Sequence, residues 1–199
     1  LVSEDGVFFG EEYTLVCVAD YVLRHQKGPL VTNLSSSRAL RDLASTFGVP
    51  CYYAPVGEVH VVNEMKSRGA VLGGEGNGGI IDPTLHYGRD SLIGIALVLM
   101  HLATSGKSLS QLKAGYPAYT MVKDKLAFDP ALSAQGILDK VAGHFDPETL
   151  DTRDGLKVDL PDAWVQLRKS NTEPILRIYA EAKNLEEAKV LVEKVKSLI

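Results

Sequence analysis

The first pattern along the chain is a run of apolar residues spaced three and four positions apart. This spacing puts side chains on one face of a helix. It predicts a helix from Glu11 to about Gln26, with its apolar face formed by Leu15, Val18, Ala19, Val22 and Leu23. An apolar run at 30–33 then precedes a second helical pattern, from Arg38 to Phe47, which stops at Gly48. The two together predict a strand followed by a helix.

The same order of strand and helix recurs twice before residue 105. Strands are predicted at 49–54 and 70–73, and helices at 57–67 and 90–104. Short strands separated by helices are typical of a parallel sheet with right-handed crossover connections. The first part of the chain therefore predicts a three-layer α/β/α domain with a mostly parallel sheet.

Around 105–117 the composition changes, and Gly, Ser, Lys and Pro become frequent. We therefore place a domain boundary near Gly115. Strands then follow at 119–127, 156–160, 163–169 and 175–182, and helices at 134–144 and 185–198. This order predicts a small α+β domain with an antiparallel sheet and packed helices. We expect residues 1–10 to be the tail of a preceding domain absent from this chain, 11–114 the α/β domain and 115–199 the α+β domain.

Composition excludes several classes of protein. The chain has 199 residues, of which 45% are hydrophobic and 23% charged, and its net charge is −4. An acidic balance argues against binding nucleic acid by general electrostatics. The longest apolar run, Leu92–Ala103, is too short to cross a bilayer. Cys17 and Cys51 have no CxxC spacing and are predicted to be buried free thiols, so we expect a cytoplasmic protein in a reducing compartment.

Glycines dominate the segment from Gly73 to Gly79, which follows directly on a predicted buried strand. Three of them satisfy the GxGxxG spacing of dinucleotide-binding turns. The context argues against a nucleotide site, because Pro83 lies where a helix should open. In addition, no acidic residue lies between Asp90 and Asp124 to bind a ribose.

The same segment is a candidate sugar-binding loop. Its glycines would let a ligand approach the backbone closely. Glu75 and Asn77 at its tip offer an acceptor and a donor–acceptor pair, which suit sugar hydroxyls. The alternative is a flexible connection in which Glu75 is only solvated.

A second polar cluster, Arg168-Lys169-Ser170-Asn171-Thr172-Glu173-Pro174, joins two predicted strands of the small domain. A guanidinium, two hydroxyls, a carboxamide and the N–H groups of a tight loop are the donors that a phosphate dianion needs. The alternative is a polar hairpin turn with an exposed basic pair.

A third cluster, Asn33 to Arg38, lies at the end of a predicted parallel strand, where ligands bind in open α/β sheets. Ser37 suits a helix cap as well as it suits a ligand contact. Residues 56–60 occupy the matching end of the next strand, and His60 reads as a structural or surface histidine. We find no catalytic triad, zinc site or calcium loop in the sequence.

Taken together, the glycine-rich segment with Glu75 and Asn77 and the cluster at 168–174 resemble the α-D-phosphohexomutase superfamily. The resemblance covers essentially the whole chain, including Glu4-Asp5-Gly6, residues 33–38, Val56-Gly57-Glu58 and Tyr87-Gly88-Arg89-Asp90. Enzymes of this superfamily have four domains, and the chain resembles the third and the fourth.

The resemblance also implies roles for individual residues. Glu75 and Asn77 would hold the 3- and 4-hydroxyls of the sugar. The phosphate that is not reacting would be held by four residues of the second cluster: Arg168, Ser170, Asn171 and Thr172. Further active-site candidates are Arg38, Gly57 and Arg89.

The expected reaction of the full-length enzyme interconverts hexose 6-phosphate and hexose 1-phosphate through a phosphoserine and a hexose 1,6-bisphosphate. The phosphoserine loop and the Mg²⁺ ligands of the family belong to the first and second domains, so they would lie outside this chain. The expected partners are therefore hexose phosphates and the N-terminal half of the same enzyme, with neither nucleic acid nor membrane. The fragment alone would lack turnover.

This chain also departs from the pattern of the family. Many relatives have Ser where it has Asn77, His where it has Gly79, and a basic residue around Pro55 or Val59. The Glu-Gly-Asn-Gly-Gly variant resembles a branch that contains phosphoglucosamine mutases and broad glucose and mannose mutases. We expect phosphoglucosamine mutase, with phosphoglucomutase/phosphomannomutase as the alternative within the family. Outside the family, the alternatives are a non-catalytic sugar-phosphate-binding module and a nucleotide-binding regulator.

Overall fold

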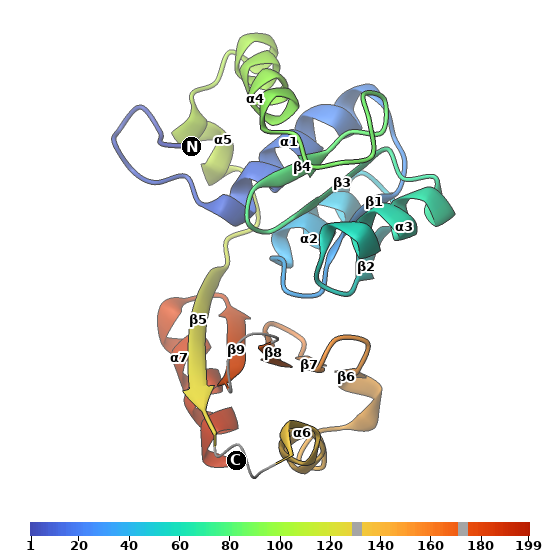
Figure 1. Cartoon of the computed structure of the whole chain (residues 1–199). Coiled ribbons are helices and arrows are strands. Elements are labelled where there is room, and N and C mark those ends of the chain that lie inside the picture. Colours follow the sequence, from blue (N-terminus) through green and yellow to red (C-terminus); the bar gives the residue numbers. More distant parts are fainter. Residues whose placement is uncertain (129–132, 171–174) are drawn as a thin grey trace. The chain divides into compact units, whose positions relative to one another are not determined.

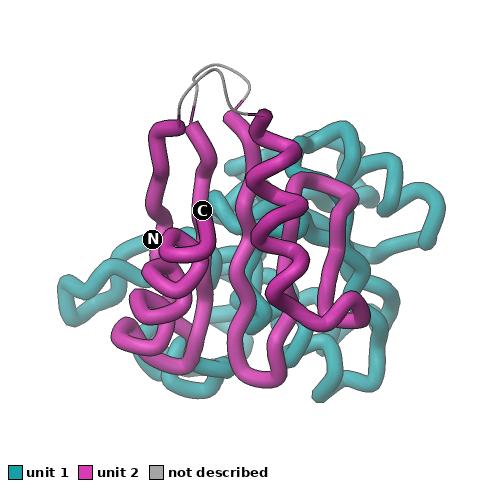
Figure 2. The backbone as a smooth tube through the Cα atoms, turned by 90° about the horizontal axis from the view of Figure 1, so that it is seen from below, with its two compact units in different colours: residues 1–118 teal, residues 119–199 magenta. Residues whose placement is uncertain are grey.

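The computed structural model describes residues 1–128, 133–170 and 175–199. The chain divides into two compact units, residues 1–118 and 119–199, which are drawn in different colours in Figure 2. Each unit has its own sheet, so each is described by itself.

The sheet of the first unit has four strands in the order β2-β1-β3-β4 (Figure 1). The strands β1, β2 and β3 are parallel, and β4 runs antiparallel to β3. Their bounds are β1 Leu30–Asn33, β2 Cys51–Ala54, β3 Leu72–Glu75 and β4 Gly79–Ile81. The helices are α1 Glu11–His25, α2 Ala39–Thr46, α3 Glu58–Arg68, α4 Ser91–Ser105 and α5 Leu109–Ala114.

Two glycines in β3 show how the helices cover this sheet. A Cβ atom on Gly73 would lie 2.2 Å from the sulfur of Met65 in α3, and one on Gly74 would lie 2.8 Å from Cδ1 of Leu15 in α1. Neighbouring residues of a strand face opposite sides of the sheet, so α1 and α3 cover opposite faces. Because α1 also packs against α2 and α4, the unit has the predicted three layers and a mostly parallel sheet.

The glycine-rich segment is a β-hairpin and not the open loop that the sequence predicts. Its first three residues belong to β3, its last residue begins β4, and Gly79 pairs with Glu75. The N–H of Gly78, which has φ of +87°, donates to the carbonyl of Glu75 at 3.0 Å. Glycine weakens strand signals, which is why the pattern hides these strands. Here the missing side chains make room for Leu15, Met65 and a tight turn.

The segment at 105–117 contains a short helix, α5, that the change of composition did not predict. Ser108 caps this helix through a reciprocal pair of hydrogen bonds with Gln111, an arrangement that satisfies two N–H groups at its start. The prediction of two buried cysteines is half wrong. Cys17 is fully buried whereas Cys51, in the edge strand β2, is partly exposed, and neither forms a disulfide.

The second unit is built on an antiparallel sheet in the order β5-β9-β8-β7-β6. Buried side chains of α6 and α7 join those of β7, β8 and β9 in one core. The cap predicted from Asn184 and Glu187 is present, because the Asn184 side chain accepts from the Glu187 N–H at 2.9 Å. The elements are β5 Thr120–Ala127, α6 Ala134–Ala142, η1 Pro147–Thr149, β6 Leu150–Asp151, β7 Leu156–Asp159, β8 Trp164–Lys169, β9 Ile175–Ala182 and α7 Leu185–Ser197.

Candidate functional site

Three strand ends of the first unit meet at the side chain of Glu75, the last residue of β3. Its Oε1 accepts from Nδ2 of Asn33, the last residue of β1, at 3.0 Å. The same oxygen accepts from the N–H of Gly57, which follows β2, at 3.3 Å. Carboxyl ends of neighbouring parallel strands lie at one edge of a sheet, the usual place for ligands in α/β folds. The structure thus brings together three of the predicted polar segments.

Arg89 completes the surroundings of Glu75. The second carboxylate oxygen, Oε2, lies 3.0 Å from Nη1 of Arg89, and Nε of the same guanidinium donates to Oε2 of Glu58 at 2.7 Å. Glu75 is only 4% exposed, so it does not stand at an exposed loop tip. A buried carboxylate needs such partners, and Arg89 supplies the charged one.

The guanidinium of Arg89 reaches Glu75 across Gly79. A Cβ atom on Gly79 would lie 2.5 Å from Cδ of Arg89, so a larger residue at 79 would displace the arginine. The hydrogen bond from Arg89 holds the pKa of Glu58 below its ordinary value. One guanidinium between two carboxylates leaves this cluster with a net negative charge. Such a cluster suits neutral hydroxyls better than a phosphate.

Ser36 ties the start of the hairpin turn to the end of β1. Its hydroxyl donates to Oδ1 of Asn33 at 3.0 Å and accepts from the N–H of Gly76 at 2.9 Å. Asn77 follows in the turn and is exposed, and its Oδ1 accepts from the N–H of Gly79 at 3.1 Å. The hydrogen bond between Gly76 and Ser36 therefore fixes the backbone of the turn, while the Asn77 side chain is accessible.

The other two active-site candidates of this unit, Arg38 and Gly57, differ in exposure: Arg38 is buried and Gly57 is partly exposed. Arg38 is 2% exposed, so its side chain is covered within the chain as it stands. Gly57 has φ of +127°, a conformation that favours glycine and that directs its N–H to Glu75.

In the second unit the structure describes two of the four predicted phosphate-binding residues, Arg168 and Ser170. Arg168 lies near the end of β8, and its Nε is 3.8 Å from Oδ2 of Asp154. Ser170 is 5% exposed, and its N–H donates to the carbonyl of Ile175 at 2.9 Å. Asn171 and Thr172 lie outside the described residues.

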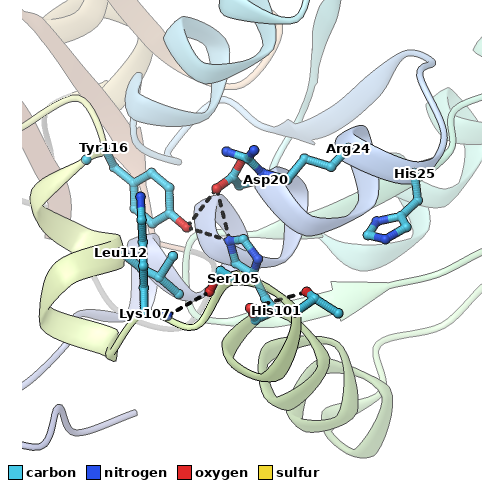
Figure 3. A pocket seen from close by; sticks show the side chains of 10 residues that line it. Asp20, Arg24, His25, His101, Ser105, Lys107, Leu112 and Tyr116 are labelled. Atoms are coloured by element: carbon cyan, nitrogen blue, oxygen red, sulfur yellow. Dashed lines mark hydrogen bonds and ion pairs between the residues drawn. The ribbon is translucent and has the colours of Figure 1, made fainter.

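Sequence reasoning missed a buried polar cluster between α1, α4 and the end of α5 (Figure 3). Nε2 of His101 lies 3.0 Å from Oδ2 of Asp20, and the Tyr116 hydroxyl donates to the same oxygen at 3.2 Å. Burial opposes ionisation of Asp20, but hydrogen bonds from His101 and Arg24 hold its pKa below the ordinary value. The available signal was polar residues inside apolar helical runs.

A cavity of about 450 Å³ adjoins this cluster and is lined also by Arg24, His25 and Lys107. Both α1 and α4 end here, and helix C-termini disfavour anions. The basic side chains that line the cavity therefore complement the negative ends of the two helix dipoles. The cluster of Asp20, His101 and Tyr116 connects α1, α4 and the residues that follow α5.

Neither a metal centre nor a membrane segment is found in the described part of the chain. No three His, Cys, Asp or Glu side chains come together there as metal ligands. No helix among these residues is both long and apolar enough to span a bilayer.

Two family models match the chain consecutively. "Phosphoglucomutase/phosphomannomutase, alpha/beta/alpha domain III" covers residues 10–119, and "Phosphoglucomutase/phosphomannomutase, C-terminal domain" covers residues 121–198. Together they account for almost all of the sequence.

Individual relatives agree with these models. A phosphoglucomutase/phosphomannomutase of Thermococcus kodakarensis is 36% identical over 96% of the chain, and a probable phosphoglucosamine mutase of Methanopyrus kandleri is 33% identical over 96%. The chain spans only 42% of either relative. A phosphoglucomutase/phosphomannomutase family protein of Burkholderia thailandensis shares the fold, with a TM-score of 0.79 at 22% identity. The alignment covers 99% of this chain and 43% of that one.

Proposed function

Because the chain belongs to the phosphoglucomutase/phosphomannomutase family, we propose that it recognises the substrate in a phosphohexomutase that interconverts hexose 6-phosphate and hexose 1-phosphate. The two relatives described above carry mutase names, and the chain spans only 42% of either. The proposed activity is therefore that of a full-length enzyme in which this chain is the C-terminal half. We favour phosphoglucosamine mutase over phosphoglucomutase/phosphomannomutase.

The observation that carries the proposal is the meeting of Asn33, Gly57 and Arg89 at Glu75. These contacts fix the Glu75 carboxylate, occupy both lone pairs of Oε1 and leave one lone pair of Oε2 for a sugar hydroxyl. The exposed carboxamide of Asn77 adds a donor and an acceptor two residues further on. A carboxylate and an amide can hold adjacent hydroxyls in either of two sugar orientations, which a mutase requires.

The phosphate that is not reacting is assigned to Arg168, Ser170, Asn171 and Thr172. A guanidinium forms two parallel hydrogen bonds with a phosphate, and Arg168 is the cation of this group. The sugar turns over as a hexose 1,6-bisphosphate between the two transfer steps, and holding it in place supplies much of the rate.

The chemical step is assigned to the N-terminal half. It would supply the phosphoserine and the ligands of Mg²⁺, which neutralises charge on the transferred phosphoryl group. Arg38 and Gly57 are further active-site candidates that the family resemblance supports. We further propose that the protein is cytoplasmic, since its proposed substrates are phosphorylated sugars.

An NMR titration of the isotope-labelled chain tests the assignment. Glucosamine 6-phosphate, glucose 6-phosphate and mannose 6-phosphate would be compared with inorganic phosphate. We expect every ligand to shift signals at 168–172, and one sugar to shift Glu75 and Asn77 as well. A full-length mutase is contradicted if the coding sequence directly upstream lacks a Ser-His loop and an Asp-rich loop. That result would favour a non-catalytic sugar-phosphate-binding module.

A further inference from the structure

The helix α4 of the first unit is apolar on every side. No Asp, Glu, Lys or Arg lies between Ser91 and Ser105. The inner face of the helix includes Gly94, Leu97 and Val98, which are buried, and α4 packs against α1. A helix that is apolar all round is normally covered all round. We therefore expect the outer face of α4 to have a partner as well.

The outer face of α4 carries four large apolar side chains that are exposed. Leu92, Ile95, Leu99 and Met100 are each between 49% and 75% exposed. Positions three and four residues apart lie on one side of a helix, so these side chains form one stripe. Single exposed apolar residues are common on proteins, whereas a contiguous group of them marks a binding surface.

The segment before α1 adds further exposed apolar side chains. Residues 1–9 form a turn that is closed by a β-bridge between Val2 and Phe8, and both side chains are exposed. The turn is attached to α5, because Ser110 donates to the Glu4 carboxylate through its hydroxyl and, at 3.4 Å, through its N–H. These contacts hold the segment in place beside the unit.

A cavity joins α4 to this segment. It measures about 320 Å³ and is lined by Ile95 together with Leu1 and Phe8. Asn77 and Gly78, from the candidate sugar-binding turn, line the same cavity. One apolar surface therefore extends from α4 to the turn proposed to hold the sugar. This α4 surface consists of Leu1, Val2, Phe8, Leu92, Ile95, Leu99 and Met100.

We propose that the α4 surface is where the N-terminal half of the enzyme docks. The identity of this partner rests on the proposed function, in which the other half of the enzyme joins the chain at Leu1. The chain matches models of domain III and of the C-terminal domain, and it spans only 42% of its two relatives. Because Leu1 itself lines the cavity, a half attached there begins at this surface.

A second copy of the chain is the competing occupant of the α4 surface. A domain joined through a short linker has an effective concentration in the range of about millimolar. A second copy must bind from free solution at its actual concentration. The attached half therefore has the advantage on a surface that lies next to its point of attachment.

Docking at this surface would also bring the two halves of the active site together. Asn77 lies on the wall of the cavity that Leu1 and Ile95 share. The phosphoserine is assigned to the N-terminal half. Its docking on the α4 surface would hold the donor of the phosphoryl group near the turn that holds the sugar, and such positioning supplies much of the rate of a reaction between two groups.

Met100 is a natural probe of the α4 surface. Oxidation of a methionine by peroxide depends on its exposure, and Met100 is 49% exposed whereas Met65 is fully buried. We would treat this chain and the full-length protein with hydrogen peroxide and follow each methionine by mass spectrometry of peptides. We expect Met100 to be oxidised about tenfold more slowly in the full-length protein, and Met65 to be protected in both.

Leu99→Lys tests the surface by substitution, with Val190→Lys of α7 as the matched control. Both residues lie in helices and are 59% exposed. In this chain alone, neither variant should change the unfolding temperature. In the full-length protein Leu99→Lys should lower that temperature by several degrees and restore the oxidation of Met100, because burying an unpaired ammonium group is costly. Val190→Lys should change neither.

Three results would overturn the interface. The first is equal oxidation of Met100 in the chain and in the full-length protein. The second is a full-length Leu99→Lys variant that is as stable as the wild type or no less stable than Val190→Lys. The third is protection of Met100 in the chain alone that disappears on dilution, which would place a second copy on the surface.

Mutase activity separates this proposal from the proposed function. A full-length protein that protects Met100 but converts no hexose phosphate would retain the interface and contradict the mutase assignment. An active full-length enzyme in which Met100 is oxidised as fast as in the chain alone would retain the assignment and contradict only the interface. Protection of Met100 in an active enzyme would support both.

Discussion

Nη1 of Arg89 lies 3.0 Å from Oε2 of Glu75, although Glu75 ends β3, Arg89 lies between β4 and α4, and their side chains differ sharply in exposure. The arginine side chain is 42% exposed and the carboxylate 6%. Glu58 holds the other edge of the guanidinium at 2.7 Å. Arg89 is thus a positioning residue that fixes the proposed sugar-binding carboxylate.

Replacing Arg89 by Gln should raise the pKa of Glu58 towards its ordinary value, because the hydrogen bond from the guanidinium is the main cause that lowers it. A carboxyl with a lowered pKa stabilises the fold above its unfolded pKa, and this contribution is lost as the pH falls through the folded pKa. The variant should therefore lose less stability on acidification. An NMR titration of the side-chain carboxyl groups measures the change.

Arg68→Gln is the control for this variant. Arg68 forms a comparable exposed pair with Glu64 within α3, at 2.9 Å, and its loss should leave the pKa of Glu58 low. An unchanged pKa of Glu58 in Arg89→Gln would mean that the arginine does not hold this carboxylate in solution.

Replacing Gly74 by Ala should destabilise the first unit. The added Cβ would lie 2.3 Å from the carbonyl oxygen of Gly79 and 2.8 Å from Leu15. Overpacking of this kind costs about 1–3 kcal/mol or more. Gly136→Ala is the contrast, since its nearest neighbour would be 3.6 Å away and Ala favours the helix α6. Urea unfolding should show a loss for the first variant and a gain of up to about 1 kcal/mol for the second.

Replacing His101 by Ala should weaken the buried cluster with Asp20 and Tyr116. We expect a loss of about 1–3 kcal/mol in the free energy of unfolding at pH 7, because Asp20 loses a hydrogen bond in a buried site. Asp20 has a lowered pKa in the fold, so its contribution exists above its unfolded pKa and is lost in acid. As the pH falls below about 5, the free energy of unfolding should therefore decrease less in the variant than in the wild type.

His144→Ala serves as the reference for the histidine variant, because His144 is exposed at the end of α6. Its unfolding free energy should match the wild type at both pH 7 and pH 4. A loss in His144→Ala as large as that in His101→Ala would show that the buried hydrogen bonds are not the cause.

The two cysteines should differ in reactivity. Burial raises the pKa of the Cys17 thiol to about 11, and the thiolate is the reactive form. Cys51 is partly exposed. A maleimide at pH 7.5 should therefore label Cys51 in the native protein and Cys17 only after unfolding, as mass spectrometry of peptides would show. Rapid native labelling of Cys17 would contradict the buried environment.

The sequence by itself determined most of the helices and strands and the edge of the sheet where the site lies, but not α5 or β4. Helical spacing and apolar runs depend on local geometry, so the predicted helix at 11–26 and strand at 175–182 match α1 and β9. Parallel strands place their carboxyl ends at one edge, which is why Asn33, Gly57 and Glu75 could be predicted to lie close together.

Only the tertiary structure decided what surrounds these residues. Arg89 meets Glu58 and Glu75 through a packing arrangement, and no periodic signal relates residues 31 positions apart in sequence. The glycines of β3 fit Leu15 and Met65, which the composition of the segment could not show. Lys125, Arg177 and Arg168 lie opposite one another on neighbouring strands because of the strand register. Two strands distant in sequence could pair in several registers. The register that forms is the one that packs the apolar face of the whole sheet, so it cannot be read from either strand alone.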